Sequence, residues 1–309
     1  MALFFVVLAG ALVACSNLFM RKSIDTGGTT KGFLVFMMFM SFFASVILDP
    51  VRKGAYTWSG EVAVLGAVAG IILITMLLFL GKALEKGPPG FTFSLLSAAT
   101  VMPGIVMFFL YGTSLGFPYT ISHAIGALLV LAGIFWAGKG TASLETKRQW
   151  ILFAIAMFSL HALLLVVFQW RALLLNHNHP EEISSFFTKE TIQSAWFLPS
   201  MFFTAGVIQL CIYVYTERKW PHPKEVYYGL FGGLANGIGN FFLICATAAA
   251  RSWENALLFP MYSVMTIILS NLWGQKLYQE KVNWKACQLS AFGLIVGLVD
   301  WKNILGAFF

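Results

Sequence analysis

The residues of this 309-residue chain that could do chemistry are polar side chains placed inside long apolar runs. Asn236 and Asn240 lie four residues apart, so on a helix they share one face. Four glycines surround them: Gly229, Gly233, Gly237 and Gly239. Two interpretations stay open for the amides. They either contact a polar solute on the wall of a cavity, or they hydrogen-bond a neighbouring helix across a small-residue contact.

His161 lies in the middle of the apolar run 149–170. An imidazole titrates near neutral pH, so it could gate a path or couple protons. A structural histidine bonded to a carbonyl is the interpretation that the sequence favours. Asn17 in the run 2–20 and Tyr262 in the run 254–275 are further candidates for solute binding, and for Asn17 a structural hydrogen bond is again the alternative.

Arg251 and Glu254 lie between two apolar runs. An arginine at the mouth of a cavity would bind a carboxylate or phosphate with two parallel hydrogen bonds. Because the two residues are three apart, they can also pair with each other. Pairing, or contact with lipid headgroups, is the favoured interpretation.

Patterns that indicate an enzyme are missing from the sequence. No Asp or Glu lies in the middle of an apolar run, so a carboxylate proton relay is not supported. The cysteines have no metal-ligand spacing: Cys15, Cys211, Cys245 and Cys287. The cluster from Asn176 to Pro180 holds two histidines and is interpreted as a solvated turn rather than a metal site. We therefore expect no enzyme, no metal and no cofactor.

The elements that position these residues follow from the composition. The chain is 59% hydrophobic and 11% charged, with a mean hydropathy of +0.79, whereas soluble domains carry roughly 25% charged residues. This predicts an all-α polytopic membrane protein. The net charge of +7 comes from basic residues that stand singly or in pairs between apolar runs, so they are interpreted as loop anchors and no nucleic-acid binding is expected.

Ten apolar runs, each about 20 residues long, could cross a membrane. They leave no room for a soluble domain, and they cover about 2–20, 32–49, 61–84, 89–111, 118–138, 149–170, 191–215, 225–248, 254–275 and 285–302. Pro103 and Pro260 are predicted to interrupt the fourth and ninth runs.

An internal repeat relates the two halves of the chain. Gly66 and Gly70 recur as Gly229 and Gly233, 163 residues later. Each half holds five runs, and two copies of an odd-numbered unit insert with opposite orientation. The sequence therefore predicts inverted repeats, 1–145 and 146–309, as in many secondary transporters.

The end of the second half carries the clearest family pattern. An acidic Glu280 lies within the stretch 277–284, and Gln288 and a Gly-rich apolar run that ends at Gly297 follow. The first half keeps the apolar run from Ile125 to Gly133 but lacks the acidic residue. With this pattern and the ten runs, the chain resembles the drug/metabolite transporter superfamily, the EamA-like ten-helix carriers.

The resemblance implies a carrier that moves a small polar metabolite by alternating access. It implies a central cavity between the halves, to which Asn17, His161, Asn236, Asn240, Arg251 and Tyr262 are assigned as candidate substrate contacts. The basic cavity edges favour an anionic or zwitterionic solute. The partners expected are this solute and the lipid bilayer of a bacterial inner membrane, with the chain as a monomer or a homodimer. A non-transporting structural partner of a larger complex is the alternative.

Two rules disagree on orientation. Most of the 20 Lys and Arg residues lie in the connections on the side opposite the termini, which places both termini outside by the positive-inside rule. The family resemblance implies that both termini lie in the cytoplasm. Both rules place the termini on one side of the membrane.

Overall fold

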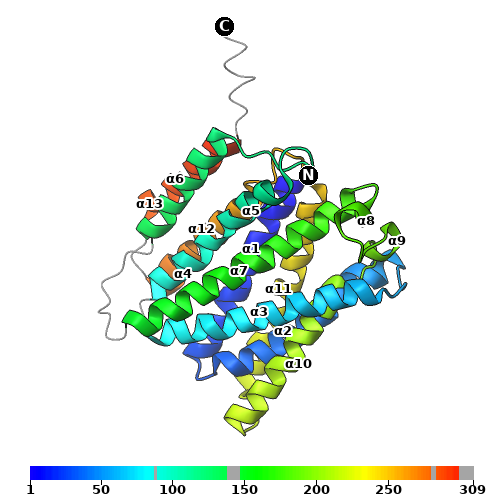
Figure 1. Ribbon diagram of the computed structural model, residues 1–309. Helices are drawn as coiled ribbons and strands as arrows, with labels where there is room; N and C mark the ends of the chain where they lie inside the picture. The colour runs from blue at the N-terminus through cyan, green and yellow to red at the C-terminus, as the bar shows by residue number, and fades with distance from the viewer. Residues whose placement is uncertain (87–88, 138–146, 280–282, 299–309) are drawn as a thin grey trace.

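The computed structural model of the protein describes residues 1–86, 89–137, 147–279 and 283–298, and this part of the chain forms helices and no strand (Figure 1). The longer helices are α1 (Ala2–Asp25), α2 (Thr30–Val46), α3 (Gly60–Lys86), α6 (Ile121–Ala137), α7 (Lys147–Asn176), α10 (Phe197–Glu217), α11 (Pro223–Ala249), α12 (Leu258–Tyr278) and α13 (Trp284–Leu298). The shorter ones are η1 (Ile47–Val51), α4 (Pro89–Ala98), η2 (Ala99–Val101), α5 (Met102–Tyr111), α8 (Pro180–Ile183) and α9 (Lys189–Ile192).

Among the described residues, seven helical segments are long and apolar enough to cross a membrane. They are 2–25, 30–51, 60–86, 92–111, 148–176, 197–217 and 223–249, and the shorter segment 121–136 is also apolar. The chain is therefore a multi-pass integral membrane protein. The count of ten spans stays a prediction, because length and composition select seven.

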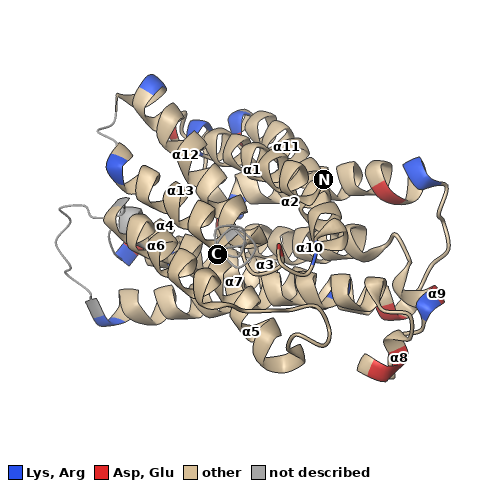
Figure 2. Ribbon diagram, turned by 90° about the horizontal axis from the view of Figure 1, so that it is seen from above, with Lys and Arg blue, Asp and Glu red and all other residues tan. Residues whose placement is uncertain are grey.

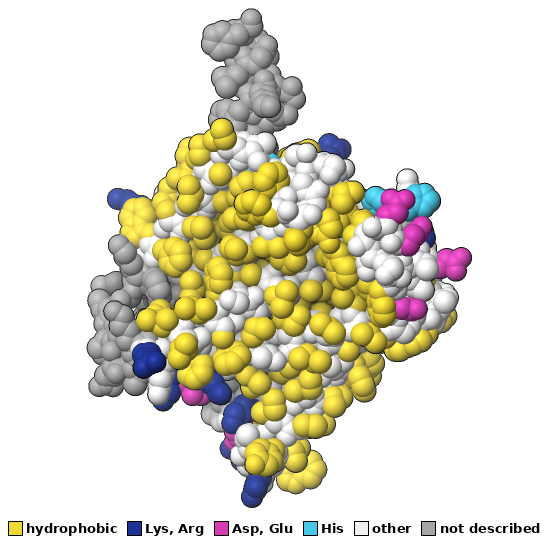
Figure 3. Space-filling view, viewed as in Figure 1, with side chains coloured by type: hydrophobic (Ala, Val, Ile, Leu, Met, Phe, Trp, Pro, Cys, Tyr) yellow, Lys and Arg dark blue, Asp and Glu magenta, His cyan; other side chains and the backbone are white. Residues whose placement is uncertain are grey.

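The surface has the distribution of side chains that a bilayer requires. Apolar side chains on α3 and α7 are exposed, among them Val64, Ile71, Leu152 and Ile155, and Figure 3 shows apolar atoms covering this face. Charged residues lie mostly at the ends of the helices and in their connections (Figure 2). Lipid solvates such apolar faces, so their exposure is not a defect of packing.

The helices pack in a small set of pairs. α1 contacts α11 and α12, α2 contacts α10 and α11, α3 contacts α7 and α10, and α6 contacts α13. The core between them is rich in phenylalanine, with Phe33, Phe168, Phe197, Phe202 and Phe259 at most 1% exposed. These large rings fix the positions of α2, α7, α10 and α12 relative to each other.

Glycines set the closest helix contacts. A Cβ atom on Gly66 or Gly70 of α3 would collide with backbone carbonyls of α10. On α11, a Cβ on Gly229 would collide with the Phe36 Cβ of α2, and one on Gly233 with the Met37 carbonyl of α2. Small residues let helix backbones approach in this way, which replaces the hydrophobic driving force that is missing between helices in lipid.

Two sequence predictions about helix breaks have different outcomes. The fourth run does break, because α4 passes through the short η2 into α5, where Pro103 is the second residue. The prediction for Pro260 is wrong. Pro260 lies in the first turn of α12, where proline is tolerated because the first N–H groups of a helix have no intrahelical partner.

Helix limits also shift where the sequence placed loops. The sixth run continues as α7 to Asn176, and the seventh helix starts only at Phe197. The predicted junction of the two repeats, between 145 and 146, falls outside the described residues, as does Glu280.

Candidate functional site

A pocket of about 380 Å³ lies at the end of the bundle where α7 and α11 terminate. The connections 112–120 and 250–257 complete its wall. Its polar lining residues are Gln169, Asn176, Thr247, Arg251, Ser252 and Asn255. Arg251 and Ser252 are exposed, so the pocket communicates with the surface on the side of the membrane where these connections lie.

Three amide side chains have fixed orientations in this pocket. Gln169 Nε2 donates to the Asn255 carbonyl (3.2 Å), Asn176 Nδ2 to the Ala248 carbonyl (3.0 Å) and Asn255 Nδ2 to the Gly116 carbonyl (2.9 Å). A carbonyl can only accept, so each amide must present its NH₂ group to it. The amide oxygens remain as acceptors, and Gln169 Oε1 has no donor among the described residues.

Arg251 contributes the cationic group of the pocket. Its backbone N–H donates to Glu254 Oε2 at 2.8 Å, and Glu254 is buried. Within the described part of the chain, no ion pair joins the two side chains, so the predicted pairing runs through the backbone. The Arg251 guanidinium is thereby left at the pocket wall.

His161 is held at a distance from this pocket. Its Nδ1 donates to the Leu96 carbonyl of α4 at 2.9 Å, so it joins α7 to α4. This is the structural hydrogen bond that the sequence favoured. Its N–H satisfies a carbonyl within a span, where an unpaired polar group is costly.

Asn236 joins α11 to α2, and Asn240 bonds Asn236 within α11. Asn236 Nδ2 donates to Ser41 Oγ at 3.0 Å, and Ser41 Oγ donates to the Gly233 carbonyl at 2.9 Å. Asn240 Nδ2 donates to the Asn236 carbonyl at 2.9 Å. The interhelical interpretation of Asn236 therefore has direct geometric support, and both amides stay half-buried.

The last two candidates lie on α1 and α12. Asn17 is exposed on α1. Tyr262 is half-buried on α12, and its backbone carbonyl faces Gly10 of α1. Of the six predicted contacts, Arg251 lines the pocket, and the other five are not among its lining residues.

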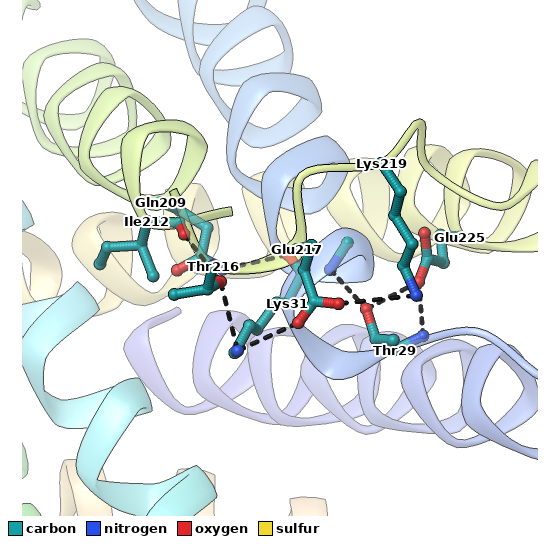
Figure 4. Close-up of polar contacts among 9 residues, drawn as sticks. Thr29, Lys31, Gln209, Ile212, Thr216, Glu217, Lys219 and Glu225 are labelled. Atoms are coloured by element: carbon teal, nitrogen blue, oxygen red, sulfur yellow. Dashed lines mark hydrogen bonds and ion pairs between the residues drawn. The ribbon is translucent and has the colours of Figure 1, made fainter. Parts of the chain in front are cut away.

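The opposite end of the bundle is closed by polar contacts between the halves (Figure 4). Glu225 of α11 is 1% exposed and accepts three hydrogen bonds. Its Oε1 accepts from Thr29 N (2.5 Å) and Thr29 Oγ1 (2.7 Å), and its Oε2 accepts from His222 N (2.7 Å). One carboxylate thus satisfies the starts of α2 and α11, where helix dipoles favour negative charge.

An ion pair adds to this closure. Lys31 Nζ of α2 lies 3.0 Å from Glu217 Oε1 of α10 and 3.3 Å from Thr216 Oγ1. Gln209 Nε2 of α10 donates to the Lys31 carbonyl at 3.0 Å. The groups drawn together in Figure 4 therefore connect residues near the start of the chain with residues beyond position 200.

Sequence reasoning underestimated the amides of the pocket. In the sequence, Gln169 is one polar residue among several in the apolar runs, Asn176 belongs to the histidine-rich turn, and nothing distinguishes Asn255 from an ordinary polar residue. The available signal was position: all three stand at ends of apolar runs that terminate on the same side of the membrane.

Comparisons with known proteins give the fold and no more. No family model matches the sequence, and no curated protein matches it. A solved structure described only as the crystal structure of a protein superposes with a TM-score of 0.67, over 95% of this chain and 93% of that chain, at 15% identity. Its likeness covers the whole bundle, so the arrangement of helices is one that a known protein also adopts.

Proposed function

We propose that the chain is a secondary carrier of a small polar solute that works by alternating access. In this proposal its ten helical segments, with α4, η2 and α5 counted as one, form two inverted repeats of five. Each repeat moves as a unit, and the solute binds between them.

The observation that carries the proposal is a pair of equivalent helix contacts. A Cβ on Gly66 of α3 would collide with the Phe197 carbonyl of α10, and a Cβ on Gly229 of α11 would approach the Phe33 carbonyl of α2 to 3.0 Å. Gly229 follows Gly66 by 163 residues, and Phe197 follows Phe33 by 164. If the two repeats are exchanged, the Gly66–Phe197 contact takes the place of the Phe33–Gly229 contact. This correspondence supports an internal two-fold relation between the repeats.

The remaining helix pairs agree with this relation. α11 packs on α1 and α2 as α3 packs on α7 and α10. The pairs α6 with α13 and α2 with α10 join counterparts to each other. In the first of these, a Cβ on Gly126 would meet the Gly293 carbonyl and one on Gly293 would meet the Gly126 carbonyl. A two-fold axis between the repeats accounts for such reciprocity.

The two ends of the bundle support alternating access. One end is held closed between the halves by Glu225 and by the Lys31–Glu217 pair, whereas the other end has the pocket. The pocket volume suits a small molecule. Its guanidinium favours an anionic group on the solute, and its amide oxygens, which only accept, favour a donor such as an ammonium group, so together they favour a zwitterionic solute.

The experiment is transport with reversible cross-links. A Cβ on Gly116 would lie 3.9 Å from the Ser252 Cβ, within the range of a disulfide, although the φ of +85° at Gly116 makes a side chain there strained. Gly116→Cys with Ser252→Cys, in a chain freed of its four native cysteines, would lock the pocket end in the arrangement seen here. Purified protein in liposomes is screened for uptake of radiolabelled amino acids, nucleotides and sugar phosphates, and the oxidised protein should lose uptake that a reducing agent restores.

Single-cysteine variants, oxidised in the same way, are the matched controls and should transport normally. Undiminished uptake by the cross-linked protein would contradict alternating access through this end. Absence of uptake for every solute class, in protein that is folded and correctly inserted, would favour the alternative of a structural membrane partner.

A further inference from the structure

Arg171 of α7 is a buried cation that the candidate pocket does not use. It is 6% exposed and lies within a membrane-spanning segment. A charged side chain at this depth is costly and usually serves a substrate path, an ion path or a paired charge. Its neighbour Ala172 lines the pocket, but the Arg171 guanidinium lies elsewhere, with Cζ 4.8 Å from the centre of the Phe197 ring.

Among the described residues, no carboxylate forms an ion pair with the Arg171 guanidinium. Asp49, at the end of α2, is the carboxylate that interacts with it electrostatically. That carboxylate forms its ion pair with Lys53. Within the described part of the chain, no ion pair and no hydrogen bond to Arg171 is found, and its Nε is buried without an acceptor. A guanidinium carries five N–H donors in a planar fork, which matches a carboxylate or a phosphate.

Further cations surround the same point. Arg52 Cζ lies 5.2 Å from the centre of the Phe241 ring, one turn before Cys245 on α11, and the neighbouring Lys53 pairs with Asp49. The Cys245 thiol interacts electrostatically with these three charged groups and with Arg171. Three of them are cations and one is a carboxylate. The cluster therefore has an excess of positive charge, and its members come from both halves of the chain.

The opposite end of the bundle explains why this charge is unbalanced. There, Lys31 of α2 pairs with Glu217 of α10. At the repeat offset of 164, Ala195 takes the place of Lys31 and Lys53 that of Glu217. The acid that neutralises a lysine at one end is thus replaced by a further cation at the other.

We propose that Arg171, together with Arg52 and Lys53, forms a binding site for an oxyanion, the carboxylate or phosphate group of a solute or of a lipid headgroup. Arg171 supplies the planar guanidinium, and the Phe197 ring packs against it. Arg52 is positioned by its Nε, which donates to the Leu48 carbonyl at 2.9 Å, and by the Phe241 ring. The proposal concerns binding and holds whether or not the chain transports.

The native thiol of Cys245 reports on the site without any transport assay. The full chain with Cys15, Cys211 and Cys287 replaced by serine is placed in nanodiscs of the neutral lipid phosphatidylcholine. An anionic methanethiosulfonate reagent should modify Cys245 at least tenfold faster than a cationic one of similar size. Inorganic phosphate or succinate should slow the anionic reagent, and chloride at equal ionic strength should not.

Variants separate binding from structure. Arg171→Gln should abolish both the preference for the anionic reagent and the protection by phosphate or succinate, and Arg171→Lys, which keeps the charge, should weaken protection about tenfold or less. Arg148→Gln removes an equal charge from the exposed start of the same helix and should behave as wild type. Asp49→Asn removes the local carboxylate and should tighten protection, whereas a purely structural role for Asp49 predicts no tightening.

Equal reaction with both reagents, or full protection in Arg171→Gln, would overturn the proposal. Discs that contain phosphatidylglycerol distinguish the source of the oxyanion. If this lipid protects Cys245 in an Arg171-dependent way and free phosphate and succinate do not, the site holds a headgroup. Failure of transport in liposomes, with protection intact, would count against the carrier and leave the site in place.

Discussion

Glu225 of α11 and Glu61 of α3 occupy equivalent positions in the two halves, 164 residues apart, yet they differ in burial and in hydrogen-bond partners. Glu225 is buried and bonds the starts of two helices. Glu61 is half-buried and accepts from Ser59 Oγ of its own helix start at 2.8 Å. At one junction a buried carboxylate thus bonds the starts of two helices, whereas at the equivalent junction the carboxylate bonds only its own helix start.

The junction at Glu61 relies on backbone carbonyls and indoles. Ser194 Oγ donates to the Thr57 carbonyl at 3.1 Å, and the rings of Trp58 and Trp196 lie 5.3 Å apart. These contacts are weaker than charge-assisted hydrogen bonds. The comparison teaches that equivalent glycine contacts set the helix spacing, while polar residues beyond them decide how firmly each end is closed.

Replacing each of the two glutamates should give the largest difference in stability between the two junctions. Glu225→Ala is expected to cost about 3 kcal/mol of unfolding free energy, because it removes the buried carboxylate that accepts three hydrogen bonds and leaves their donors without an acceptor. Glu61→Ala should cost about 0.5 to 1 kcal/mol, the loss of one helix-start contact. Thermal unfolding of both variants in detergent measures the difference, and equal losses would contradict the asymmetry.

The glycine contacts should respond alike in the two halves. Gly70→Ala and Gly233→Ala each place a Cβ against a backbone carbonyl of the neighbouring helix, at Met201 and Met37 respectively. Overpacking of this kind costs about 2 kcal/mol. Gly81→Ala is the matched control, because a Cβ there would meet no atom of the described residues within 4 Å. A large difference between the two test variants would argue against equivalent packing.

The amide pair on α11 distinguishes packing from solute contact. Asn236→Ala removes the bond to Ser41 and should cost about 0.6 kcal/mol, as is typical for interhelical hydrogen bonds in membranes. If Asn236 also lines the solute path, uptake falls several-fold more than the folded fraction does. Uptake that falls only in step with folded protein would assign the amides to packing alone.

The Lys31–Glu217 pair should have the smallest effect on stability and a distinct effect on opening. The Lys31 side chain is 43% exposed, so Lys31→Ala should cost about 0.5 kcal/mol. Thr216→Cys, in a chain without native cysteines, should then react faster with a charged thiol reagent. The swap Lys31→Glu with Glu217→Lys should restore slow labelling, and labelling that is unchanged in every variant would show that the pair does not hold this end closed.

Several features could be predicted from the sequence because they depend on local composition. The shortage of charge indicated a membrane protein, and the glycines around Asn236 indicated a small-residue helix contact, which Gly229 and Gly233 make with α2. The pocket could not be predicted, because Gln169, Asn176 and Asn255 come from different segments and are polar in an ordinary way. Pro260 misled the prediction, since a proline in a long apolar run does not show whether the helix starts before it or at it.

The sequence by itself determined that this protein resides in a lipid bilayer, and it determined the spacing of the small residues at helix contacts. Hydropathy and small-residue periodicity act through each segment alone, so they need no partner to be recognised. Only the tertiary structure decided which polar groups meet. It brought Thr29 to Glu225 across 196 residues of the chain, left Arg171 without an ion pair among the described residues and placed Arg251 at a pocket. A charge is satisfied by whatever lies across a helix contact, and local sequence does not show which residue that is.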